Sequence, residues 1–117
     1  MPNEPEMRIM NLLQKYMDKN FVQRLFLPKL YPRMERPDLG PGNFSTHLMS
    51  YGTAGNKYIV YPEIIYDQKT SQLKRLGGWE AQDYAIKNNE FIPFDTEEEA
   101  ANFSQYYKSA FPPGHFD

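Results

Sequence analysis

Apolar residues recur at helical spacing near the start of the chain, between Glu6 and Lys19. Positions i, i+3, i+4 and i+7 of this segment carry Ile9, Leu12, Leu13 and Tyr16. This spacing predicts an amphipathic helix. The helix either packs on its own domain or forms an arm that docks on a partner, where Met17 would supply an adaptable contact.

A second short helix is predicted from Asn20 to Phe26, with Asn20 and Gln23 at the spacing of a capping box. Pro28 ends it. Proline then recurs every four or five residues through 27–43, with two glycines late in the stretch, so this segment forms an irregular loop. Its apolar residues, Tyr31 and Met34 among them, indicate a loop that packs on its own domain or on a neighbour.

Period-two alternation replaces helical spacing after residue 44. It predicts a strand over 45–51, a hairpin turn over 52–56 and a main strand over 57–66. The main strand is apolar on both faces, which indicates cover on both sides. Pro62 interrupts it and implies a bulge or an edge position. A short third strand is expected at 72–76.

The last third of the chain predicts two helices. The first runs over 79–87, and Asn88 and Asn89 close it as residues that tolerate the left-handed conformation. Residues 91–94 are extended. Asp95 or Thr96 caps the second helix, whose acidic first turn suits the helix dipole. Its apolar stripe consists of Ala100, Phe103, Tyr107 and Ala110.

These elements predict an α+β fold in one domain. A small antiparallel sheet of two or three strands packs with the two C-terminal helices, preceded by an N-terminal helical arm and the proline-rich loop. The expected divisions are an N-terminal helical segment over 1–26, the loop over 27–43, a compact block over 44–111 and a tail over 112–117.

Composition narrows the functional classes. The chain has 117 residues, a net charge of −2 and no cysteine. Disulfides and cysteine chemistry are excluded, and a reducing compartment or a virion fits this composition. Nucleic-acid binding is not expected because no basic footprint is present. The start of the chain shows no signal-peptide pattern, and no apolar run is long enough to span a membrane.

Candidate catalytic groups are sparse. Ser45 and His47 share a strand face but lie about 7 Å apart by strand rise, too far for a nucleophile–base pair. Glu63 and Glu80 are the acids placed near a concave surface, and two isolated carboxylates do not make a glycosidase. Three consecutive acids, Glu97 to Glu99, fan around the helix axis and read as capping residues. We therefore predict no catalytic residue, no cofactor and no metal.

Aromatic residues are abundant, with nine Tyr, eight Phe and one Trp. Tyr51, Tyr58, Tyr61, Trp79 and Tyr84 form either part of the core or a surface that binds sugar or peptide. The candidate partner contacts are the apolar and aromatic residues of the predicted arm, loop and strands: Ile9, Leu13, Tyr16, Met17, Tyr31, Met34, Tyr51 and Tyr61.

Five stretches resemble a small module of tailed bacteriophages, found as short phage proteins and within very large phage proteins, sometimes beside lytic transglycosylase domains. The stretches are Asn20-Phe21-Val22-Gln23-Arg24-Leu25, Ser45-Thr46-His47-Leu48-Met49, Tyr58-Ile59-Val60-Tyr61-Pro62, Phe91-Ile92-Pro93-Phe94-Asp95-Thr96 and Phe103-Ser104-Gln105-Tyr106-Tyr107-Lys108. The resemblance covers about residues 20–108 and implies a phage or prophage origin. It brings no catalytic residues with it.

The leading interpretation is a non-enzymatic phage protein that acts by protein–protein interaction, as a minor structural or virion-associated component. Its partners would be other virion proteins or further copies of itself, and its location the virion or the host cytoplasm. The alternative is an accessory protein that binds or inhibits a host or defence enzyme. A cell-wall-related accessory module comes third.

Overall fold

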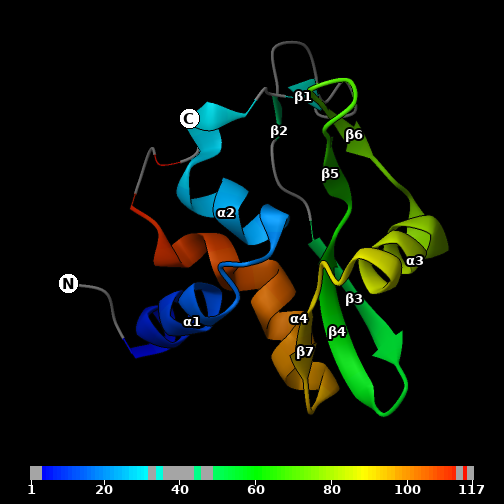
Figure 1. Cartoon of the computed structure of the whole chain (residues 1–117). Helices are drawn as coiled ribbons and strands as arrows, with labels where there is room; N and C mark the ends of the chain where they lie inside the picture. Colours follow the sequence, from blue (N-terminus) through cyan, green and yellow to red (C-terminus); the bar gives the residue numbers. More distant parts are fainter. Residues whose placement is uncertain (1–3, 32–33, 36–43, 46–48, 113–114, 116–117) are drawn as a thin grey trace.

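A computed structural model describes residues 4–31, 34–35, 44–45, 49–112 and 115 (Figure 1). Within them the chain has the predicted α+β fold, with four α-helices and small antiparallel sheets of two or three strands. The helices are α1 (Glu4–Lys15), α2 (Asn20–Phe26), α3 (Gly78–Asn88) and α4 (Glu97–Tyr106), and the 3₁₀ turns are η1 (Pro28–Leu30) and η3 (Tyr107–Ala110). The strands are β1 (Met34–Glu35), β2 (Phe44–Ser45), β3 (Met49–Ala54), β4 (Lys57–Pro62), β5 (Ile64–Asp67), β6 (Gln72–Arg75) and β7 (Ile92–Phe94).

The main sheet has the strand order β3-β4-β7. The predicted hairpin is present, but β3 continues to Ala54, which pairs with Lys57, so the turn contains two residues rather than five. Gly55 occupies the first of these positions with a φ of +63°. Glycine at that position is typical of a type II′ turn, whose twist matches the twist of the flanking strands.

The third strand of this sheet is not the predicted one. Residues 92–94, expected to be merely extended, form β7 and pair with β4, Val60 opposite Ile92. The segment expected as the third strand instead forms β6, which pairs with β5 in a separate hairpin. The predicted 57–66 strand is divided at Glu63, directly after Pro62, because proline cannot supply a ladder donor.

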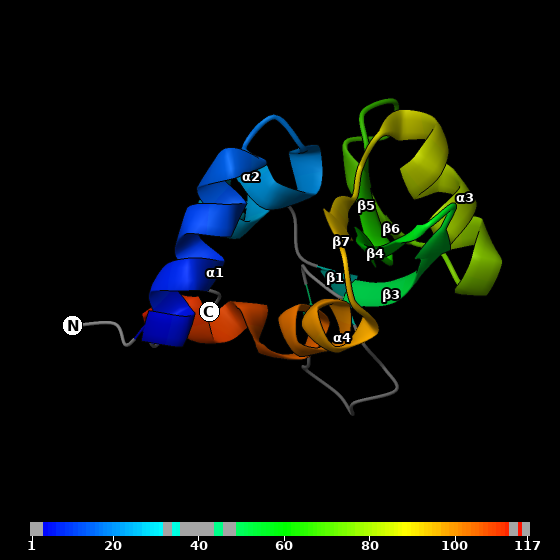
Figure 2. The same ribbon diagram turned by 90° about the horizontal axis from the view of Figure 1, so that it is seen from below.

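Strand β4 is covered on both faces, as its apolar alternation predicts. Figure 2 shows the sheet between α4 on one side and α3 on the other, and both helices contact β4. Val60 points into the larger core with Phe103 and Leu13, whereas Ile59 and Tyr61 point into a smaller core under α3. Successive strand residues face opposite ways, so one strand supplies both cores.

Helix α4 begins, and helix α3 ends, with the capping residues that the sequence predicts. Thr96 is the N-cap of α4: its hydroxyl oxygen accepts a hydrogen bond from the Glu99 amide at 3.2 Å. The predicted stripe faces the core, with Ala100 and Phe103 buried on α4; Tyr107, also buried, begins the 3₁₀ turn η3, so the α-helix ends before the last two residues of the stripe. Asn89 closes α3 in the left-handed region, with a φ of +55°. The capping signals at the start of α4 and at the end of α3 are therefore confirmed.

The N-terminal helix packs on the domain. Helix α1 contacts η3, Leu13 is fully buried, and Ile9, Leu12 and Tyr16 pack against the larger core. The helix ends at Lys15, four residues earlier than predicted. Of the two roles predicted for this helix, packing on its own domain is the one that accounts for its apolar stripe.

Gln82 joins helix α3 to strand β3, at a place where Gly52 leaves room for its side chain. Gln82 donates from Nε2 to the Thr53 carbonyl at 2.6 Å, and a Cβ at Gly52 would lie 2.8 Å from Gln82 Oε1. We predict that Gly52→Ala displaces this side chain and costs about 1 kcal/mol more in the presence of Gln82 than in a Gln82→Ala background. Urea denaturation of the four proteins measures this coupling. Equal costs in the two backgrounds would show that Gln82 does not require the glycine.

Candidate functional site

A groove lies between α1 and α4, with a volume of about 700 Å³. Its lining comes from α1, the end of β7, α4 and η3. The lining residues are Glu6, Arg8, Ile9, Leu12, Phe94, Glu99, Asn102, Phe103, Tyr106 and Ser109. The volume falls in the range typical of ligand sites, about 300–1,000 Å³.

Aromatic and aliphatic side chains line the apolar part of the groove. The rings of Phe94 and Phe103 lie 5.4 Å apart, which joins the end of β7 to α4. Ile9 and Leu12 come from the stripe of α1. Tyr106 projects from the last turn of α4 and is 53% exposed. This combination of the buried ring of Phe103, the partly buried ring of Phe94 and an exposed tyrosine suits apolar contact with a second molecule.

The polar lining carries more negative than positive charge. It includes the carboxylates of Glu6 and Glu99 and the guanidinium of Arg8. Glu99 accepts a hydrogen bond from the Thr96 hydroxyl at 2.9 Å, and the Ser109 hydroxyl donates to the Tyr106 carbonyl at 2.7 Å. Asn102 is exposed on the wall formed by α4. These groups are placed for binding and present no nucleophile–base pair.

The partner contacts predicted on the helical arm lie partly in this groove, partly in the core and partly on the exposed surface. Ile9 lines the groove. Leu13 lies wholly inside the core, which leaves no side-chain surface for a partner. Tyr16 is half-buried, and Met17, just after the helix, is 40% exposed.

The remaining predicted contacts lie away from the groove. Tyr31 packs edge-to-face on Tyr66, with ring centroids 5.0 Å apart, so the loop begins by packing on its own domain. Tyr51 is partly exposed on β3, and its hydroxyl donates to Glu97 at 3.4 Å. Tyr61 is buried under α3 and cannot reach a partner. The side chain of Met34 lies outside the described residues.

The predicted aromatic face does not form a single surface. Tyr58 packs toward the core on the α4 side of the sheet, while Tyr61 and Tyr84 belong to the core under α3. Trp79, in the first turn of α3, is 79% exposed. Alternation along β4 separates these rings, so the reading of the set as one binding face is wrong.

The acids considered for catalysis have separate surroundings. Glu63, between β4 and β5, accepts a hydrogen bond from the Ser50 hydroxyl at 2.7 Å. Glu80 is exposed in the first turn of α3. His47 lies outside the described residues. Across the part of the chain that the structure describes, no three His, Asp or Glu side chains form a group able to hold a metal ion.

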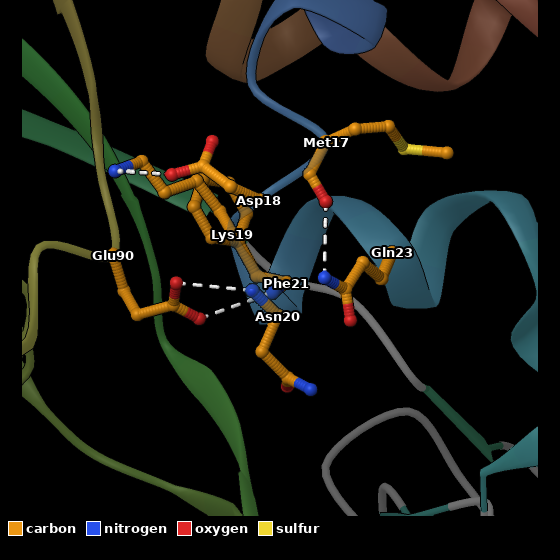
Figure 3. Close-up of polar contacts among 7 residues, drawn as sticks. All are labelled: Met17, Asp18, Lys19, Asn20, Phe21, Gln23 and Glu90. Carbon is orange, nitrogen blue, oxygen red and sulfur yellow. Dashed lines mark hydrogen bonds and ion pairs between the residues drawn. The ribbon is translucent and has the colours of Figure 1, made fainter.

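Glu90 forms a polar joint between the two halves of the molecule (Figure 3). It follows α3, and its carboxylate accepts hydrogen bonds from the backbone amides of Asn20 at 3.0 Å and Phe21 at 3.2 Å. The predicted Asn20–Gln23 capping box is wrong: Lys19 is the N-cap and contributes no side-chain bond, while Gln23 donates from Nε2 to the Met17 carbonyl. A carboxylate distant in sequence therefore satisfies the first amides of α2.

Arg24 lies beside this joint and is only 1% exposed. Its Nη2 donates to the Ile64 carbonyl at 2.6 Å, and its Nε donates to Asn20 Oδ1 at 3.1 Å. Burial lowers the pKa of the guanidinium to about 10, against the attraction of Glu90. The side chain remains charged at neutral pH and ties α2 to β5.

Burial raises the pKa of Glu90 above its ordinary value of 4.5, although the amides of Asn20 and Phe21 and the charges of Arg24 and Lys19 oppose the shift. The folded chain therefore holds this proton more readily than the unfolded chain. The resulting stabilisation is full below pH 4.5 and is lost as the pH rises through the folded pKa.

We predict a pH-dependent difference between the native chain and Glu90→Gln, which cannot titrate at this position. The free energy of unfolding of the native chain minus that of the variant should be greatest below pH 4.5 and fall toward pH 7. Urea denaturation of both proteins across this range measures it. A difference that grows toward pH 7 would mean that the amides and cations outweigh burial.

No helix in the described residues is long and apolar enough to cross a membrane. Comparisons with protein-family models, with curated proteins and with solved structures find no match.

Proposed function

We propose that this chain is a non-enzymatic bacteriophage protein that acts by protein–protein interaction, as a minor structural or virion-associated component. The resemblance of residues 20–108 to a small phage module supports the phage origin. The observation that carries the binding role is the groove between α1 and α4. It combines an apolar lining, a polar rim and the exposed ring of Tyr106.

Tyr106 is the residue on which the proposal depends most directly. Tyrosine is enriched among the residues that dominate binding energy at interfaces, because its ring is apolar and its hydroxyl tolerates water. The side chain lines a groove to which Ile9 and Leu12 add aliphatic surface. A partner side chain seated there would bury the exposed half of the ring together with those side chains.

The second candidate function is an accessory protein that binds or inhibits a host or defence enzyme. The packing of α1 on the domain favours it, because a structural arm would be expected to leave its apolar stripe exposed. The acidic first turn of α4 gives such an inhibitor a face complementary to a basic target.

We expect Tyr106→Ala to lower the copy number of this chain in phage particles severalfold while leaving its fold intact, because exposed side chains contribute little to stability. Trp79→Ala on α3 is the matched control, since it removes another exposed aromatic ring away from the groove. Quantitative mass spectrometry of purified particles gives the copy numbers of both variants and of the native chain.

Two results would contradict the proposal. Absence of the native chain from purified particles would reject a virion component and favour the accessory protein. Equal copy numbers for both variants and the native chain would remove the groove as the contact surface.

A further inference from the structure

We infer that the groove between α1 and α4 receives one apolar face of a partner helix that carries lysine or arginine beside that face. The inference rests on the proposed function, in which this groove is the contact surface, and adds the shape and the charge of the partner.

The walls of the groove favour a helix as its occupant. One wall is α1, a helix of 12 residues, or about 18 Å at 1.5 Å per residue. The other runs along α4, where Asn102 and Tyr106 form one row of the lining and Glu99 and Phe103 the next, each pair spaced four residues apart. Apolar anchors at i, i+3, i+4 and i+7 of a third helix match two such walls.

Strand addition is the competing mode, because β7 is an edge strand of the main sheet. Two features oppose it. The strand has three residues, and its middle residue, Pro93, has no amide hydrogen to donate. A peptide paired along β7 would gain few main-chain hydrogen bonds. The side chains that line the groove therefore decide which partner this surface prefers.

The charge of the groove selects the partner's polar residues. Glu6 and Glu99 line it, and Arg8 is the cation among its lining residues. Two carboxylates and one guanidinium give the lining a net negative charge. A partner with lysines or arginines flanking its apolar face meets attraction there, and a partner with acids in the same places meets repulsion.

The apolar anchors meet Ile9, Leu12 and Phe103 at the base of the groove and Tyr106 at its edge. Leucine, methionine or phenylalanine side chains fit this lining, since each buries apolar area against aliphatic and aromatic carbon. A helix with polar residues in the anchor positions would leave those residues desolvated without partners.

The test uses stapled helical peptides of about 15 residues, because unstapled helices of this length are marginal in water. One peptide carries leucine anchors flanked by lysine, a second replaces each lysine with glutamate, and a third replaces each leucine with serine. Fluorescence anisotropy measures their affinity for the full chain, and amide chemical shifts locate the contact. We expect the lysine peptide to bind at least about fivefold tighter than the glutamate peptide, with shifts at Leu12, Asn102 and Tyr106.

Two charge reversals provide the matched comparison. Glu6→Lys changes the first part of α1 inside the groove, whereas Glu80→Lys makes the same change of net charge in the first turn of α3, on the other side of the sheet. We expect the first to weaken binding of the lysine peptide about fivefold and the second to leave it unchanged. Equal weakening by both reversals would reduce the effect to overall charge and overturn the inference.

Two further results would also overturn it: no binding by the lysine peptide, and binding of the serine peptide as tight as that of the lysine peptide. The particle copy number of Tyr106→Ala separates these failures from failure of the proposed function. A lowered copy number with no peptide binding rejects the partner chemistry and retains the virion role. Peptide binding at the groove with an unchanged copy number rejects the virion role and retains the preference for a cationic helix.

Discussion

Arg24→Ala is expected to lower the free energy of unfolding by about 3–5 kcal/mol, because it breaks the contacts of a buried charged side chain. The change removes hydrogen bonds to the Ile64 carbonyl and to Asn20 Oδ1. It also removes one of the two cations that act on Glu90, leaving Lys19, and opens a void at one of the most buried positions in the molecule. Urea denaturation followed by circular dichroism at neutral pH measures the loss.

Arg75→Ala is the control, because it removes an exposed arginine from β6. Its cost should stay within about 0.5 kcal/mol. Replacing both charged side chains, Arg24→Met together with Glu90→Gln, should cost less than the sum of these two single changes, since neither charge is then left alone. If Arg24→Ala costs no more than Arg75→Ala, the guanidinium does not hold α2 to β5.

Leu13→Ala should cost about 3 kcal/mol, within the usual range for a leucine in a core. Leu13 is fully buried in the same cluster as Phe21, Val60 and Phe103, so its removal leaves a cavity between α1 and the sheet. Thermal and urea denaturation should both register the loss as a single transition, because α1 belongs to the same core.

Met17→Ala is the matched control on the exposed side of the arm, and its cost should stay within about 0.5 kcal/mol. These two substitutions distinguish a helix that packs on its own domain from one that only docks on a partner. A helix that only docks on a partner would tolerate both substitutions equally in the isolated chain, and this result would contradict the packing of α1 on the domain.

Local signals in the sequence predicted the presence of the helices and of the β3–β4 hairpin. The cap of α4 required only Thr96 and Glu99, and the end of α3 required only Asn89, which accepts the left-handed conformation. The alternation along β4 predicted cover on both sides of the sheet. Each of these features depends on residues within a few positions of one another, which is why a sequence pattern can contain them.

The sequence patterns did not predict the features that join segments distant along the chain. Nothing near Asn20 indicates that Glu90 binds its amide, and a weak local capping box took its place in the prediction. The pairing of β7 with β4 was missed for the same reason, since both partners of a non-local pair look merely extended. One signal for the joint was available: Arg24 lies between Val22 and Leu25 in an apolar segment, so a helix that buries its neighbours also buries the arginine.

The candidate site was predicted only in part. Ile9 was singled out and lines the groove, whereas Tyr106 was passed over because it lies beside the apolar stripe of α4 rather than in it. Leu13 and Tyr61 were selected for being apolar or aromatic, which are also the properties of core residues. A helical pattern gives the direction of a side chain relative to its own helix, but it does not give the position of the next helix.

The bonds from Glu90 to the start of α2 also constrain the order of events during synthesis. The carboxylate lies 70 residues after the first amide that it binds. A ribosome that adds about 5–20 residues per second synthesises α2 several seconds before it adds Glu90. During that interval the amides of Asn20 and Phe21 donate to water instead of to Glu90, and the apolar side chains of α2 lack this tie to the second half. This half of the molecule can reach its final state only when the second half has arrived, and contacts of such long sequence separation are associated with slow folding.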